Sequence, residues 1–171
     1  MTPRDAAIGA RRSTTTHETS YATPSARELV ITRTFDAPRG LVWAAFTDPK
    51  HLPNWQTGPA GVTMPVCEID LRPGGIWRYV WRNAHGREFG ATGTYREVDP
   101  PSRIVTVSHA DGEENLSTTT FTEENGRTTV TVAQVFASAA SRDKAIPYAR
   151  MGTASSYARL DSYLTDLATQ R

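Results

Sequence analysis

Two carboxylates, Glu68 and Asp70, stand two residues apart in a stretch whose residues favour a β-strand. Successive strand residues point to opposite faces, so both acids share one face, where the pKa of one of them would rise and acid–base chemistry would become possible. Arg72 follows on the same face, however, and a solvated, salt-bridged sheet edge is the favoured interpretation. We therefore predict no catalytic residue in this pair.

The histidines and the cysteine predict no metal centre. His51, His85 and His109 fall in a helix, a turn and a strand end, without the i, i+4 spacing of a helical metal site, and Cys67 is the single cysteine. His109 ends a strand beside a possible cavity, where an imidazole can transfer a proton, although a surface position is the favoured reading. The sequence contains no glycine-rich phosphate loop and no nucleophile elbow, so we expect no cofactor.

A strand with strict alternation carries three aromatic residues. Trp77, Tyr79 and Trp81 share one face, and Arg78 and Arg82 lie on the other, which is therefore the wet face. Each aromatic side chain buries roughly 150–250 Å², more than one strand can hide, and the indole N–H and phenol O–H groups need partners when buried. These rings either line a ligand cavity or pack as ordinary core.

Hydrophobic period and turn signals predict the elements that must position these rings. The expected order is a strand over 28–35, two short helices ending near 46 and 54, about six antiparallel strands (62–71, 76–82, 88–98, 103–109, 116–123 and 127–136) and a helix over 141–168. Asp36 is the expected N-cap of the first helix and Ser141 that of the last, whose Leu160 and Leu164 should be buried and Arg159 exposed. This order predicts an α+β fold in which a curved sheet grips the C-terminal helix.

Residues 1–26 show no period of two or 3.6 and predict a disordered N-terminal tail before a domain over 27–171. Arg4, Arg11 and Arg12 among hydroxyl residues leave a transit peptide as the alternative.

The amino-acid composition limits the kinds of partner that we expect this protein to bind. The chain has 171 residues, 38% of them hydrophobic and 22% charged, with a net charge of +1. Nothing in this balance favours nucleic acid, and no apolar run reaches the length of a membrane span, so we expect neither nucleic-acid binding nor membrane insertion. One cysteine cannot form an intramolecular disulfide, which fits a cytoplasmic protein.

Several motifs together resemble a known family. They are Phe46-Thr47-Asp48-Pro49, Trp55 with Gly58-Pro59, residues 70–79, residues 93–101, and Gly152 with Leu160-Asp161 and Leu164. They resemble the heat-shock chaperone ATPase activator-like (AHSA-like) family of the START-like, birch-pollen-allergen-like (SRPBCC) superfamily, over about residues 28–167. The resemblance implies a helix-grip fold and a range of functions that includes lipid carriers, polyketide cyclases and co-chaperones. Here Gln56 and Thr57 follow Trp55 where that family often pairs tryptophans, and Gly152-Thr153 replaces its late Gly-Trp, which implies a larger or reshaped pocket.

The favoured function is binding of a small hydrophobic or aromatic molecule between the sheet and the last helix. The expected lining residues are Trp55, Trp77, Tyr79, Trp81, Tyr95, Phe121, Met151 and Tyr157. One alternative is a co-chaperone-like module that uses the Arg78/Arg82 face to stimulate a heat-shock chaperone ATPase. Another is a cyclase or hydrolase with Tyr79, His109 or Glu97 as proton carrier. No constellation of residues singles out this alternative, so a binding protein is favoured over an enzyme.

Overall fold

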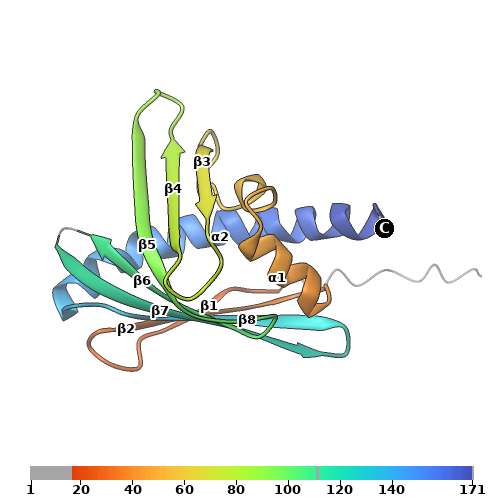
Figure 1. Ribbon diagram of the computed structural model, residues 1–171, viewed down its shortest axis with the longest axis horizontal. Coiled ribbons are helices and arrows are strands. Elements are labelled where there is room, and N and C mark those ends of the chain that lie inside the picture. Colours follow the sequence, from red (N-terminus) through yellow and green to blue (C-terminus); the bar gives the residue numbers. More distant parts are fainter. Residues whose placement is uncertain (1–16, 111, 171) are drawn as a thin grey trace, which may run out of the picture.

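The computed structural model describes residues 17–110 and 112–170, and Figure 1 shows their arrangement. The elements follow in the order β1 (Ser20–Ala22), β2 (Glu28–Phe35), α1 (Arg39–Thr47), the 3-10 helix η1 (Leu52–Asn54), β3 (Thr63–Ile69), β4 (Ile76–Arg82), β5 (Glu88–Asp99), β6 (Arg103–Ala110), β7 (Glu113–Glu124), β8 (Arg127–Val135) and α2 (Ala139–Thr169). Within these residues, eight strands form one sheet in the order β1-β2-β8-β7-β6-β5-β4-β3. The long helix α2 crosses the curved sheet in Figure 1, which confirms the predicted α+β helix-grip fold.

Strand β4 alternates as predicted. Trp77 is buried, whereas Ile76 on the other face has 61% of its surface exposed and Arg78 and Arg82 are exposed too. The outer face carries ion pairs, because Glu68 on β3 lies directly opposite Arg78, with 3.6 Å between the carboxylate and the guanidinium. The expected salt-bridged edge is therefore present: Arg78 pairs with Glu68, and Arg72 pairs with Asp70 at 2.9 Å.

Helix α2 begins earlier than predicted. Ser138, not Ser141, is its N-cap, and the Ser138 hydroxyl accepts a hydrogen bond from the Ser141 backbone N–H at 3.1 Å. Two serines three residues apart present the same sequence signal, and only the geometry shows which one caps. Leu160 and Leu164 are buried as expected.

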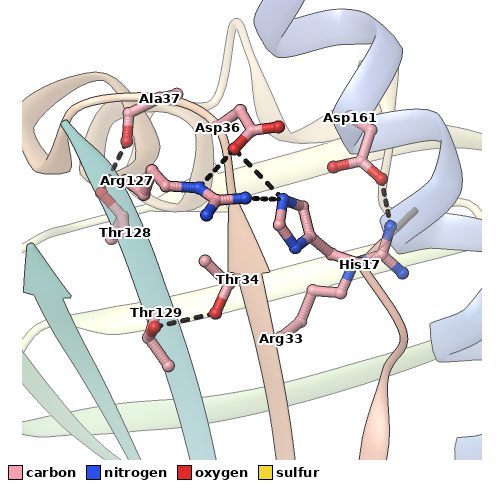
Figure 2. Close-up of polar contacts among 9 residues, drawn as sticks. All are labelled: His17, Arg33, Thr34, Asp36, Ala37, Arg127, Thr128, Thr129 and Asp161. Atoms are coloured by element: carbon pink, nitrogen blue, oxygen red, sulfur yellow. Dashed lines mark hydrogen bonds and ion pairs between the residues drawn. The ribbon is translucent and has the colours of Figure 1, made fainter. Parts of the chain in front are cut away.

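Helix α1 has Pro38 as its N-cap, and Glu123, not Asp36, accepts the hydrogen bond of its first backbone N–H at 2.8 Å, so the expected role of Asp36 is wrong. Asp36 instead accepts a hydrogen bond from Arg127 Nε at 2.7 Å and lies 3.1 Å from His17 Nε2 (Figure 2). The helix begins at Arg39, so Asp36 stands two residues before the N-cap, and its carboxylate pairs with Arg127 instead.

The N-terminal segment differs from the tail expected over residues 1–26, because Ser20–Ala22 forms strand β1 paired with β2. Thr19 accepts a hydrogen bond from Arg33, a buried residue of β2. Figure 2 shows that the Arg33 guanidinium also pairs with Asp161 on α2. A three-residue strand held by backbone pairing and such contacts has no period to detect. The ordered domain therefore starts before residue 27, while residues 1–16, with the transit-peptide alternative, lie outside the described residues.

Candidate ligand cavity

A cavity of about 770 Å³ lies between the sheet and α2. All of the expected lining residues except Phe121 contribute to its wall. Phe121 is buried behind that wall, with its ring 5.3 Å from the rings of both Trp43 and Phe46. Phe121 is therefore a core residue and does not line the cavity as expected. An inward-facing position on β7 can reach either the cavity or the core, and strand alternation does not distinguish the two.

The aromatic face of β4 and β5 forms one continuous wall. Trp77 stacks on Tyr79 with ring centroids 5.0 Å apart, and Tyr79 meets Trp81 edge-on at 5.9 Å. Trp81 stacks on Phe89, its cross-strand partner, at 5.8 Å. Flat rings arranged in this way present their faces and edges to a neighbouring planar molecule.

Glycine makes room for the deepest ring of this wall. Gly93 lies opposite Trp77 in the sheet, and a Cβ at Gly93 would come within 2.6 Å of the indole and 2.2 Å of the Val107 carbonyl oxygen. The Trp77 indole therefore packs flat against bare backbone. Its Nε1 is enclosed and has no hydrogen-bond partner among the described residues.

Trp55 and Tyr157 close the cavity at the end nearest α1. Trp55 donates its indole N–H to the Ala45 carbonyl at 2.9 Å, and its ring lies 4.7 Å from Phe46 and 6.1 Å from Tyr157. Trp55 and Tyr157 are almost fully buried. This cluster anchors α1 and the following loop to α2.

Helix α2 lines the cavity with small residues. Ala145, Ala149, Gly152 and Thr153 recur at helical spacing on the side of the helix that faces the sheet. Larger side chains take over further along, where Tyr157 and Leu160 are buried. The helix therefore leaves space over its first half and fills it over its second half.

The loop between η1 and β3 forms one rim, and α2 holds it in place. Arg159 on α2 donates to Thr57 Oγ1 at 2.6 Å, to the Trp55 carbonyl at 3.2 Å and to the Gly58 carbonyl at 3.2 Å. Ser156 accepts from the Gly58 backbone N–H at 2.9 Å. Arg159, expected to be exposed, is instead half-buried and binds this loop, a tertiary contact for which the sequence offers no local signal.

Trp81 holds the same loop from the sheet side. Its indole N–H donates to the Gln56 carbonyl at 2.8 Å, and its ring remains only half-buried. The loop that carries Gln56 therefore connects β4 to α2 across the cavity.

Exposed apolar residues surround the mouth. Phe89 on β5 has 50% of its surface exposed, and Tyr148 and Met151 on α2 have 74% and 58% exposed. All three line the cavity, so its opening lies between the β4–β5 hairpin and the first half of α2.

Hydroxyl and amide groups form the remaining wall, which the sequence reasoning missed. Thr106, Ser117 and Gln134 lie on β6, β7 and β8 and all face the cavity. Val105 and Val107 alternate with Thr106 and occupy the opposite face of β6. Val105 and Val107 are both buried on that opposite face, so the alternation in β6 does not show which of its two faces borders the cavity.

The described part of the cavity wall contains no Asp, Glu, Lys, Arg or His side chain. Burial raises the pKa of Tyr95 to about 12 and raises the pKa of Tyr79 and of Tyr157 as well, so these phenols stay neutral at neutral pH. Of the three proton carriers considered, Tyr79 lines the cavity, whereas His109 is exposed and Glu97 pairs with Arg103 at 3.4 Å.

Across residues 17–110 and 112–170, no three His, Cys, Asp or Glu side chains lie close enough to hold a metal ion. The same residues include no helix with the length and apolar character required to cross a membrane.

Comparison with known proteins identifies the family. Residues 36–165 match the model of the family described as activator of Hsp90 ATPase homolog 1-like protein. The chain belongs to this family. Within the AHSA-like family, the tryptophan expected after Gly152 would stand at Thr153, which lines the cavity, so that side chain would occupy part of the space. Family membership supports a binding or interaction module and assigns no particular ligand or chaperone.

Solved structures agree with this assignment. A protein from Rhodobacter sphaeroides is 31% identical, with a TM-score of 0.82, over 87% of this chain and 99% of that one. Protein Ms6760 from Mycobacterium smegmatis is 25% identical, with a TM-score of 0.74, over 88% of this chain and 98% of that one. An AHSA1-like protein from Aeromonas hydrophila, 24% identical, shares the fold with a TM-score of 0.65 over 81% of this chain and 94% of that one. Curated proteins offer no match to the sequence.

Proposed function

We propose that this protein binds a small hydrophobic or aromatic molecule in the cavity between the sheet and α2. The observation that carries the proposal is a cavity of about 770 Å³ with an aromatic wall on one side and an apolar mouth. Ligand pockets span about 300–1,000 Å³ and are lined mainly by apolar and aromatic side chains.

A packing argument favours a ligand site over loosely packed core. Protein interiors contain few voids larger than a water molecule, because empty space forfeits dispersion contacts. Here small residues of α2 stand opposite Trp77, Tyr79 and Trp81, where larger aliphatic residues would close the gap. A bound molecule that fills the gap would restore the dispersion contacts that the empty space forfeits.

The test is saturable binding of the neutral fluorescent probe N-phenylnaphthylamine, measured by its emission and by quenching of tryptophan emission. Ala149→Phe places a ring inside the cavity and should weaken binding at least tenfold. Ala158→Phe makes the same change at an exposed position of α2 and should leave binding unchanged. Absence of saturable binding to the native protein, or equal effects of the two substitutions, would refute the proposed site.

The outer sheet face offers a second candidate function. Ile76 is largely exposed beside Arg78, and the family name suggests stimulation of an Hsp90-type ATPase. If this face binds such a chaperone, Ile76→Asp should abolish stimulation of its ATPase and leave probe binding intact. No stimulation by the native protein would remove this candidate.

A further inference from the structure

A row of hydrogen-bonding side chains crosses the sheet beneath the cavity. Thr106 on β6 pairs with Ser117 on β7, and Ser117 pairs with Gln134 on β8. Tyr95 on β5 pairs with Thr106 and continues the row toward the aromatic wall. With neighbouring strands about 4.8 Å apart, these four positions span roughly 14 Å, which is the scale of a molecule with several rings.

The polar atoms of this row are open to the cavity. Among the described residues, Arg33 Nε and Trp77 Nε1 are the enclosed side-chain nitrogen or oxygen atoms that lack a hydrogen-bond partner. Thr106, Ser117 and Gln134 are half-buried cavity residues, and their side chains form no hydrogen bond with another described residue. Their hydroxyl and amide groups are therefore available to a bound molecule or to water.

The cavity is thus two-sided and uncharged. Trp77, Tyr79 and Trp81 form one wall, and the polar row forms another. With no ionised side chain in the described wall, a buried ionic group would lose its hydration and gain no counter-charge. A pure hydrocarbon would displace water from the row without replacing its hydrogen bonds.

We propose that the row Thr106, Ser117 and Gln134 is the hydrogen-bonding half of the ligand site, and that the ligand is an uncharged ring compound with hydroxyl or carbonyl oxygens along one edge. The rings would lie against the aromatic wall while the oxygens bond the row. This inference rests on the proposed ligand-binding function and adds the chemical class of the ligand.

Isothermal titration calorimetry with three matched probes tests the inference: naphthalene, dihydroxynaphthalene and naphthalene disulfonate. We expect dihydroxynaphthalene to bind most tightly and the disulfonate to bind at least tenfold more weakly than naphthalene. Ser117→Ala and Thr106→Val should each weaken dihydroxynaphthalene binding about two- to tenfold, the usual range for one hydrogen bond, and change naphthalene binding less than twofold. Thr118→Val on the opposite face of β7 is the matched control and should change neither.

The outcomes separate the two claims. If none of the probes binds, the ligand-binding function fails and this inference fails with it. If naphthalene binds as tightly as dihydroxynaphthalene, or if the Ser117 and Thr106 variants behave like the Thr118 control, the polar half is refuted while cavity binding stands. Tight binding of the disulfonate would overturn the requirement for an uncharged ligand. Thermal melts of each variant show that the fold is intact, so a loss of affinity reports on the site.

Discussion

Replacing Arg159 with alanine should destabilise the protein by loosening the rim of the cavity. The guanidinium donates three hydrogen bonds to the loop, at 2.6 Å to Thr57 Oγ1 and at 3.2 Å to the carbonyls of Trp55 and Gly58. A typical hydrogen bond contributes about 0.5–1.5 kcal/mol net, so three give about 1.5–4.5 kcal/mol. Two of the three freed acceptors belong to the buried residues Trp55 and Thr57, so the expected loss stays at about 1.5–4.5 kcal/mol.

The assay is urea unfolding followed by tryptophan emission, since Trp55 belongs to this loop and Trp81 donates a hydrogen bond to it. Lys144→Ala, at an exposed position of α2, is the control and should change the free energy of unfolding by less than about 0.5 kcal/mol. Arg159→Lys keeps the charge and loses the forked geometry, so it should recover only part of the loss. Equal unfolding free energies for Arg159→Ala and Lys144→Ala would refute the reasoning and leave the Trp81–Gln56 and Ser156–Gly58 contacts as the restraints on the loop.

Three further predictions concern the core and the sheet around the cavity. Leu160→Ala should lower the free energy of unfolding by about 2–5 kcal/mol in the same urea melts, because Leu160 is fully buried. Asp166→Ala, on the exposed side of α2, should lower it by less than about 0.5 kcal/mol. Similar losses for the two variants would mean that α2 buries another face. Gly93→Ala should lower the free energy of unfolding by about 1–3 kcal/mol or more, because the new Cβ would clash with Trp77 and a backbone oxygen. It should also shift the near-ultraviolet circular dichroism of tryptophan, and an unchanged spectrum would contradict that packing. Burial raises the pKa of the Cys67 thiol to about 11, so its thiolate is scarce at pH 8. Iodoacetamide should therefore alkylate native Cys67 more slowly than urea-unfolded Cys67, and the rate for the native protein should increase up to about pH 11. Equal rates for the two states at pH 8 would refute the raised pKa.

The topology was predictable because its signals are local. The strict alternation of Trp77, Tyr79 and Trp81 against Arg78 and Arg82 determines which face of β4 is buried without reference to the rest of the chain. Glycine- and proline-containing turns separate the strands, and the change to a helical period marks α2. Short antiparallel connections then leave few alternatives for the order of β3 to β8.

Contacts that join distant segments were not predictable in the same way. Arg159 reaches a loop about a hundred residues earlier in the chain, and Arg33 pairs with Asp161, with no pattern in either segment to announce the partner. Strand β1 is too short for a period and is defined by its pairing with β2. The polar row was missed for another reason: Thr106, Ser117 and Gln134 become one feature only through the register of three strands.

The cavity itself arises from a change of side-chain size along one helix. Ala145, Ala149 and Gly152 face the sheet over the first half of α2, whereas Tyr157 and Leu160 fill the same side further on. The large residues fix the distance between helix and sheet, because their packing in the core is tight and cannot compress. The small residues then cannot close the gap, and the space opposite the β4 rings persists. The second half of the helix thus stabilises the fold, and the first half leaves space for a ligand. Enlarging a residue of the first half should therefore lower ligand affinity more than it changes the free energy of unfolding.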